Sequence, residues 1–260
     1  MREHSSAYYL IELVRTVRNW PLYLLQKYGV VHPEHPVYKL RNGMRVHSRS
    51  YKIDRGAINE VWLDRIYDPP AFPWDECRTV VDVGANIGTF TLFAASKAPG
   101  ARIIAFEPAP DTAAVLQTNV DDNGLGSRIT VDKRGLAHDE GTRTFYISER
   151  CSWFSSLYHP PKGAATPMTI TVTTLKTIFD QYKIDRCDFL KIDCEGTEYE
   201  SLYNLPEELW LKIRFMAIEY HTFTDHPKGN VKDLTAFLEG KGYRVTEREN
   251  CVIYATRIKD

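Results

Sequence analysis

Residues 79–90 read TVVDVGANIGTF and carry the pattern that decides the fold. The apolar run TVVDV is typical of a strand that is buried on both faces of a parallel sheet. Gly84 and Gly88 follow it, and a helix is predicted from Thr89 to Lys97. Small residues between a buried strand and a helix let the backbone pass close to a ligand, and a helix start offers N–H groups to it. The stretch therefore predicts a strand, a ligand-binding turn and a helix.

Units of strand and helix repeat downstream of this turn. Helical patterns separate the apolar strands until the last two, 243–247 and 251–256, follow each other directly. The other predicted strands are 101–106, 128–131, 187–193 and 214–220, with an additional hairpin of 143–148 and 168–174. This order predicts an α/β fold: a Rossmann-like, mostly parallel seven-stranded sheet with helices on both faces and a final antiparallel pair.

The first 54 residues contain no motif that indicates chemistry. Residues 6–28 are predicted to form a helix that is interrupted at Pro21, because apolar residues repeat there at helical spacing. These apolar residues are Leu10, Leu13, Val14 and Val17. A hairpin is predicted around Asn42-Gly43, a strong turn signal. We expect residues 1–54 to be an N-terminal helix and hairpin appendage, and residues 55–260 to form the main domain.

Asp54 is predicted to cap a further helix that runs to about Ile66. The apolar stripe of the N-terminal helix would pack on the domain or on a second copy of the chain. A homodimer through this helix is therefore one expected assembly, and shallow contact with a membrane or an acceptor is the alternative.

Composition and charge narrow the class of protein. Hydrophobic residues make up 43% of the 260 residues and charged residues 26%, as in ordinary soluble domains. The formal net charge of -1 offers no basic field for nucleic acid. The 5 cysteines are odd in number and never spaced CxxC, which argues against a disulfide framework or a zinc site. No run reaches the ~18 apolar residues of a membrane span, and no signal peptide is recognisable, so a cytoplasmic protein is expected.

Two classes of cofactor site use a glycine-rich turn of this kind. The dinucleotide fingerprint G-x-G-x-x-G needs Gly at position 86 and Gly or Ala at 89, where this chain has Asn86 and Thr89. The methyltransferase pattern, an acid followed by three alternate glycines, is matched by Asp82, Gly84 and Gly88, with Asn86 at the middle glycine. Asn tolerates a positive φ better than other non-glycine residues, so this departure is mild. A purely structural turn is the alternative.

A carboxylate follows the second strand at the same edge of the predicted sheet. Glu107 lies 23 positions after Gly84, where it can accept hydrogen bonds from both hydroxyls of a ribose. Ligands of open α/β sheets bind outside the carboxyl ends of the strands, which places Glu107 beside the glycine turn. The alternative is a solvated glutamate at a strand end.

Three carboxylates crowd the turn after the fourth core strand: Asp193, Glu195 and Glu198. Acids are favourable at a helix start, and capping alone would explain one or two of them. They could otherwise hold the amino group of a cofactor, accept a proton or bind a hard cation. Glu195 is the first choice of base, Asp193 is assigned to orienting cofactor or metal, and capping explains Glu198.

The fifth core strand ends in Glu219-Tyr220-His221, next to the fourth in the expected sheet order. Glu219 could join Asp193 around a metal, or His221 could act as a general base. A polar strand end without a chemical role is the alternative.

The chain resembles the FkbM family of methyltransferases in the motifs DVGANIG (82–88), FEP (106–108), LKIDCEGTE (190–198) and AIEYH (217–221). The resemblance covers roughly residues 37–221. It implies a class I methyltransferase fold, S-adenosylmethionine as methyl donor and a hydroxyl acceptor, often on a sugar, polyketide or other natural product. One departure is Lys176, where the family commonly has Asp.

The resemblance also implies roles for individual residues. It implies a reaction centre at Asp193 and Glu195. It implies that Gly84, Asn86 and Gly88 line the cofactor and that Glu107 binds its ribose. Further candidates for the cofactor site are Asp82, Ala85, Pro108 and Asp193. Related sugar methyltransferases bind magnesium through acids after the fourth and fifth strands, which points here to Asp193 and Glu219, although His221 is not the residue expected beside them.

The sequence therefore predicts an S-adenosylmethionine-dependent methyltransferase that O-methylates a small-molecule or glycan acceptor. Its catalytic candidates are Glu195, Asp193 and His221. The alternatives are a non-catalytic cofactor-binding or scaffold protein and an NAD-dependent oxidoreductase, which Asn86 and Thr89 disfavour. A nucleic-acid acceptor is not expected, because the chain has no Pro-Cys pair for cytosine chemistry.

Overall fold

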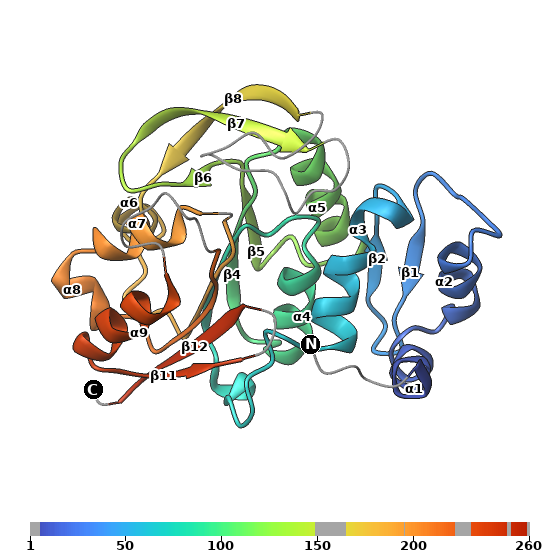
Figure 1. Cartoon of the computed structure of the whole chain (residues 1–260), viewed down its shortest axis with the longest axis horizontal. Helices are drawn as coiled ribbons and strands as arrows, with labels where there is room; N and C mark the ends of the chain where they lie inside the picture. The colour runs from blue at the N-terminus through green and yellow to red at the C-terminus, as the bar shows by residue number, and fades with distance from the viewer. Residues whose placement is uncertain (1–5, 149–164, 195, 222–229, 249–250, 259–260) are drawn as a thin grey trace.

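A seven-stranded sheet forms the centre of the molecule in the computed structural model, which describes residues 6–148, 165–194, 196–221, 230–248 and 251–258 (Figure 1). In spatial order its strands are β11 (Tyr243–Glu247), β12 (Val252–Arg257), β10 (Phe215–Glu219), β9 (Phe189–Ile192), β3 (Thr79–Val83), β4 (Arg102–Phe106) and β5 (Ile129–Asp132). Strands β10, β9, β3, β4 and β5 are parallel, and β12 is antiparallel to both of its neighbours. The predicted α/β fold with its reversed final pair is confirmed.

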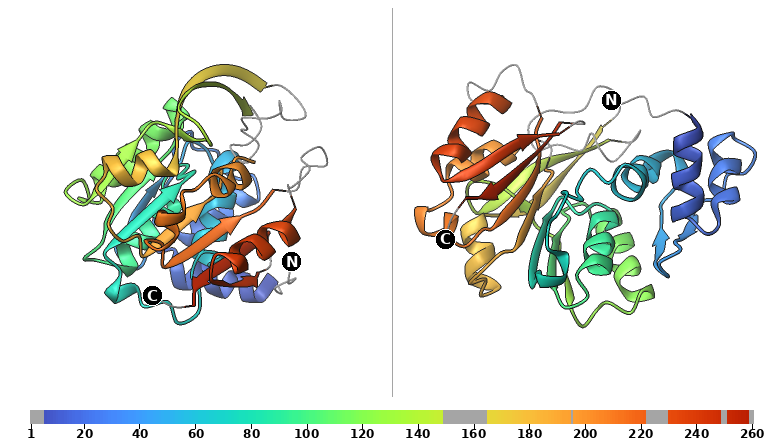
Figure 2. Two further views of the ribbon diagram at one scale, coloured as in Figure 1. Left: turned by 90° about the vertical axis from the view of Figure 1, so that its left-hand side faces the viewer. Right: turned by 90° about the horizontal axis from the view of Figure 1, so that it is seen from below.

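Helices cover both faces of this sheet (Figure 2). One face carries α4 (Thr89–Lys97) and α5 (Pro110–Asp122), and the other carries α6 (Leu175–Gln181), α7 (Glu198–Tyr203), α8 (Glu207–Trp210) and α9 (Val231–Gly240). Successive strand side chains point to opposite faces, so Val80 joins the core under α4 and α5, whereas Val81 joins the core under α6, α7 and α9.

The N-terminal segment contains α1 (Ser6–Thr16), α2 (Trp20–Lys27), and the hairpin of β1 (Val37–Lys39) and β2 (Arg45–His47). Leu13 and Val17 are fully buried and belong to the same core as α4 and α5. Leu10, expected on the packed stripe, is instead 44% exposed. The interruption of the helix and the hairpin are confirmed, and only the edge of the apolar stripe was placed wrongly.

Strand β2 pairs with β1 outside the central sheet and lies against α5 (Figure 1). The Asn119 side chain accepts from the His47 N–H at 2.6 Å and donates to the His47 carbonyl at 3.0 Å. Its amide nitrogen also donates to the carbonyl of Ile87, in the glycine turn, at 2.7 Å. One buried asparagine therefore joins the N-terminal segment, α5 and the turn.

The helix that connects the N-terminal segment to the sheet is α-helical in its first part and π-helical in its second part. The α-helical part, α3 (Tyr51–Ile58), begins before Asp54, so Asp54 is not the N-cap that the sequence predicts. Its fully buried carboxylate accepts instead from the backbone N–H of Arg49, at 2.6 Å. The helix continues as a π-helical turn, Asn59–Leu63, in which the N–H of Asp64 donates to the carbonyl of Asn59 at 2.8 Å. Such turns are rare and frequently occur at functional sites.

A second sheet of three strands lies beyond the carboxyl edge of β5 (Figure 1). It contains β6 (Gly135–Leu136), β8 (Ala165–Thr173) and β7 (Gly141–Ser148), in this order, and its long antiparallel pair is the additional hairpin expected from the sequence. A short 3-10 turn, Trp74–Glu76, precedes β3. Among the described residues, no helix is both long and apolar enough to cross a membrane.

Candidate active site

The glycine turn between β3 and α4 has the backbone conformation that its residues predict. Gly84, Asn86 and Gly88 all have positive φ, of 73°, 52° and 87°. A Cβ atom at position 84 would lie 1.6 Å from the carbonyl oxygen of Asp193, so only glycine fits there. Asn86 supplies the left-handed conformation at the middle position, as the sequence suggested.

Hydrogen bonds hold this turn against the neighbouring strand. The N–H groups of Gly84 and Ala85 both donate to the carbonyl of Phe106, at 3.1 and 2.8 Å. Gly88 is the N-cap of α4, and a Cβ atom there would meet the Leu116 side chain at 2.4 Å. The turn is therefore a fixed cradle at the carboxyl ends of β3 and β4.

Glu107 lies directly beside the cradle and is only 7% exposed. Its Oε2 accepts from the N–H of Asn86 and its Oε1 from the N–H of Ala109, each at 2.9 Å. Burial raises the pKa of Glu107 to about 7, although the Ala109 N–H and the Arg49 guanidinium act to lower it. Pro108, half-buried, follows it at the same edge. Glu107 therefore lies next to the glycine turn, as the sequence predicted.

Asp82 lies beneath the cradle and is fully buried. The hydroxyl of Thr91, in α4, donates to its Oδ2 at 2.5 Å, and the ammonium of Lys191 lies 3.5 Å from its Oδ1. Burial raises the pKa of Asp82. Asp82 therefore contacts groups that support the turn from below.

Lys191 is a buried cation that the sequence analysis missed. Its ammonium donates to the carbonyl of Gly84 at 2.7 Å and lies 3.2 Å from Oδ2 of Asp193. Burial lowers its pKa, but Asp193 and Asp82 raise it by more, so that the pKa lies above its usual value. A lysine within the otherwise apolar strand FLKI was the signal that could have revealed it.

Three predicted side chains come together at the ends of β9 and β10. One ligand-type atom from each of Asp193, Glu219 and His221 lies within 4.8 Å of the others. The fourth candidate, Glu195, lies outside the described residues. The sheet order thus brings Asp193, Glu219 and His221 together as the sequence predicted.

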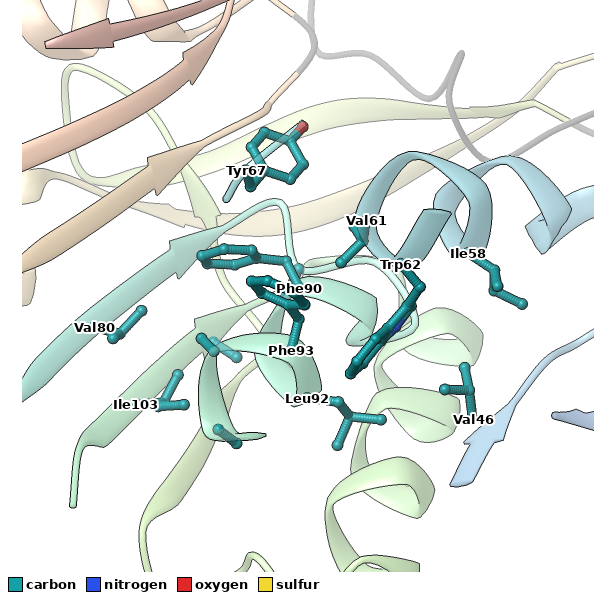
Figure 3. Packing of buried hydrophobic residues seen from close by; sticks show 14 of the residues in the cluster. Val46, Ile58, Val61, Trp62, Tyr67, Val80, Phe90, Leu92, Phe93 and Ile103 are labelled. Carbon is teal, nitrogen blue, oxygen red and sulfur yellow. The ribbon is translucent and has the colours of Figure 1, made fainter. Parts of the chain in front are cut away.

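Tyr67 joins this group from a distant part of the chain. It is 3% exposed, and its hydroxyl donates to Oε2 of Glu219 and lies 3.4 Å from Oδ2 of Asp193. Figure 3 shows the Tyr67 hydroxyl pointing away from the apolar cluster that contains Phe90. Burial and the charge of Asp193 raise the pKa of Glu219 to about 8. A tyrosine in a proline-flanked loop carried no sequence signal for this role.

Glu60 faces the same region from the π-helical turn. Burial raises its pKa to about 7, and the charges of Asp193 and Asp64 add to this rise. The sequence analysis gave Glu60 no role, because Glu60 lies far upstream of the strand ends in the sequence. Acidic groups thus outnumber the cation Lys191 at this edge of the sheet.

Glu198 does more than cap α7. It is fully buried, and its Oε1 accepts from the backbone N–H of His221 at 3.0 Å and lies 2.9 Å from the ring Nδ1. Its Oε2 accepts from the N–H of Gly196 at 2.7 Å. When Nδ1–H donates to a carboxylate, the lone pair of the neutral ring is on Nε2. Glu198 therefore fixes the orientation of the imidazole next to Asp193 and Glu219.

The comparisons with known proteins identify the family. A family model described as the methyltransferase FkbM domain matches residues 82–245, more than half of the chain. The chain belongs to the FkbM family of methyltransferases. This family assignment confirms the resemblance seen in the sequence and removes the oxidoreductase alternative.

Several curated proteins that this chain is similar to are named as methyltransferases. Methyltransferase sdnD of Sordaria araneosa is 30% identical over 215 residues, which cover 72% of this chain and 81% of the relative. The 31-O-demethyl-FK506 methyltransferase FkbM of Streptomyces tacrolimicus is 27% identical, covering 85% and 93%. The hexuronic acid methyltransferase AglP of Haloferax volcanii is 28% identical, covering 63% and 62%.

Proposed function

We propose that this methyltransferase uses S-adenosylmethionine to methylate a hydroxyl oxygen of a small-molecule or glycan acceptor. The glycine cradle with Glu107 bound beside it is the observation that carries the choice of donor. The name of one relative, a 31-O-demethyl-FK506 methyltransferase, supports a hydroxyl acceptor, and that of another, a hexuronic acid methyltransferase, supports a sugar acceptor. When bound, S-adenosylmethionine supplies a methyl group that its sulfonium charge already activates.

The cofactor would be held at the carboxyl edge of β3, β4 and β9. Glu107 accepts one backbone N–H on each oxygen, and a carboxylate can accept about four hydrogen bonds, so it has capacity for both ribose hydroxyls. The cradle of Gly84, Ala85, Asn86 and Gly88, with Asp82 beneath it and Pro108 beside it, would line the donor. Asp193 would accept from its amino group. The excess of acids at this edge favours a cationic sulfonium.

We propose that His221 accepts the proton of the acceptor hydroxyl. An alcohol is a poor nucleophile, and a base near neutral pKa improves it. The Glu198 carboxylate holds Nδ1 of His221, which places the basic lone pair on Nε2 and stabilises the imidazolium that forms. Asp193 and the sequence-favoured base Glu195 complete the proposed catalytic residues.

The same residues fit a magnesium ion only in part. Magnesium prefers oxygen ligands in a near-octahedral arrangement, whereas this group offers two carboxylates and one imidazole. Asp193 is already paired with Lys191 at 3.2 Å, and Glu219 accepts from Tyr67. Because both carboxylates already have partners, we assign no step to a metal at Asp193 and Glu219. EDTA-treated enzyme should accordingly keep its full rate, and a rate restored by added magnesium would contradict this assignment.

Transfer of a labelled methyl group tests the proposed function. The enzyme is incubated with methyl-labelled S-adenosylmethionine and a panel of sugar, uronic acid and polyketide acceptors, each beside an analogue that lacks the free hydroxyl. We expect label in a product that is stable to mild base, as an ether is, and only with hydroxylated acceptors. Label transferred equally to the deoxy analogues would contradict O-methylation.

Location and assembly belong to the same proposal. The net charge of -1 favours a neutral acceptor over nucleic acid, and the unpaired cysteine pattern favours the cytoplasm.

Ile11 and Leu25 are 48% and 42% exposed on α1 and α2, which would suit the homodimer expected from the sequence. Sedimentation of the wild type and of Ile11→Glu tests it: a wild-type monomer would contradict the dimer.

A further inference from the structure

Arg49 lies between β2 and α3, upstream of the residues that the family model matches, and it reaches the cofactor cradle. Its Nη1 donates to the Thr112 hydroxyl at 2.6 Å, and its Nη2 donates to Oδ1 of Asn86 at 3.2 Å. Thr112 is in the first turn of α5, which follows Glu107. One guanidinium thus contacts both segments that border the proposed cofactor site.

Asp54 fixes this guanidinium in place. The fully buried Asp54 carboxylate accepts from Nε of Arg49 at 3.2 Å and from its Nη2. It also accepts from the Arg49 backbone N–H at 2.6 Å, so the arginine is held at both ends. A planar guanidinium can serve a carboxylate and two further acceptors at once, and a lysine ammonium cannot reproduce that geometry.

The contact at Asn86 connects Arg49 to Glu107. Asn86 accepts from Arg49 through its side chain and donates through its backbone N–H to Glu107 at 2.9 Å. Two cations act on the Glu107 carboxyl: Arg49 and, with a smaller effect, Lys191 from β9. Arg49 therefore affects both the shape of the cradle and the charge of the carboxylate beside it.

We propose that Arg49 is a positioning residue for cofactor binding, which holds Asn86 in the cradle beside Glu107. This inference rests on the proposed use of S-adenosylmethionine. It assigns part of the cofactor site to a segment in which the sequence showed no chemistry.

The charge of Glu107 gives this role a distinctive pH dependence. Burial raises the pKa of Glu107 to about 7, and Arg49 opposes that rise. The ionised carboxylate is the better acceptor for ribose hydroxyls, so the affinity for S-adenosylhomocysteine should increase as the pH rises through this range. Loss of Arg49 should move the midpoint of that increase to higher pH, because a nearby positive charge favours the ionised carboxyl.

Calorimetric titration with S-adenosylhomocysteine between pH 6 and 8.5 tests the proposal on wild type, Arg49→Met and Arg45→Met. Arg45 is the matched control, since it precedes Arg49 in the same segment but its guanidinium pairs with the exposed Asp122 at the end of α5. We expect Arg49→Met to bind roughly 10-fold more weakly at pH 7, with part of the loss recovered at pH 8.5, and Arg45→Met to bind as wild type does. Glu60 and Glu219 also titrate in this range. Glu107→Gln therefore shows which part of the pH dependence of binding comes from Glu107.

Wild-type affinity and midpoint in Arg49→Met, even with a lowered melting temperature, would overturn the proposal. Should that variant not fold, Arg49→Lys keeps the charge but not the fork: weaker binding with an unchanged midpoint supports the positioning role, and unchanged affinity contradicts it. A wild-type enzyme that binds no S-adenosylhomocysteine at any pH would instead contradict the proposed cofactor.

Discussion

Gly84 shows how a single residue sets the shape of the cofactor cradle. The left-handed backbone and the approach of the Asp193 carbonyl both exclude a side chain there. The motif alone could predict the glycine, but not the atom that makes it necessary, since Asp193 is more than a hundred positions away in the sequence.

Replacing Gly84 with alanine should therefore destabilise the fold more than conformational strain alone does. Gly124 is the matched control, because its φ of 66° is similar but no atom lies within 4 Å of a Cβ built there. In urea titrations, the free energy of unfolding should fall by about 1 kcal/mol in Gly124→Ala. The fall should be larger by ~2 kcal/mol or more in Gly84→Ala. Equal losses in the two variants would show that the clash is relieved by a backbone shift.

The assignment of the base is also decided at the level of single residues. His221→Asn keeps a donor for Glu198 and removes the titrating ring, so kcat should fall by at least ~10²-fold while affinity for S-adenosylhomocysteine stays within about threefold. Glu195→Gln should have a much smaller effect on kcat. The reverse pattern would return the base to Glu195, which the sequence favoured.

At the scale of elements, the parallel strands bring distant acids to one edge. Alternation of strand and helix was enough to predict that Glu107, Asp193 and Glu219 lie at one edge of the sheet, because the carboxyl ends of parallel strands meet there. The π-helical turn and the following loop add Glu60 and Tyr67 to this edge. No local pattern predicts those two, since their position depends on how the upstream helix packs against α4.

This concentration of buried acids makes the stability of the unliganded enzyme depend on pH. The pKa values of Glu60 and Glu107 are raised to about 7 and that of Glu219 to about 8. A carboxyl whose pKa is raised by folding stabilises the fold below its unfolded pKa, and this stability is lost as the pH rises through the folded value. If the three shifts add, we expect the unfolding free energy to fall by up to roughly 8 kcal/mol between pH 5 and 8.

Denaturant titrations across this pH range measure the effect. Glu219→Gln should flatten the decline in its upper part, because it removes the group with the highest of the three pKa values. A stability that rises from pH 5 to 8 in the wild type would be incompatible with buried, protonated carboxyls at this edge.

At the scale of the whole molecule, residues 6–54 share a hydrophobic core with the main domain. Leu13, Val17 and Tyr38 are fully buried in the same core as the helices on one face of the sheet. The sequence could predict the elements of this segment, yet not their contribution of Arg49 to the cofactor cradle. Ion pairs such as Arg49–Asp54 have no periodicity, so only the folded arrangement reveals them.

The cradle of Gly84 to Gly88, together with Glu107, is proposed to bind S-adenosylmethionine. Calorimetry at pH 8, where Glu107 is mostly ionised, tests it with S-adenosylhomocysteine and with NAD. The wild type should bind S-adenosylhomocysteine and not NAD. Loss of a charged acceptor costs ~1.5–3 kcal/mol, so Glu107→Ala should bind S-adenosylhomocysteine about 10–150-fold more weakly. Wild-type affinity in Glu107→Ala would contradict this account of the site.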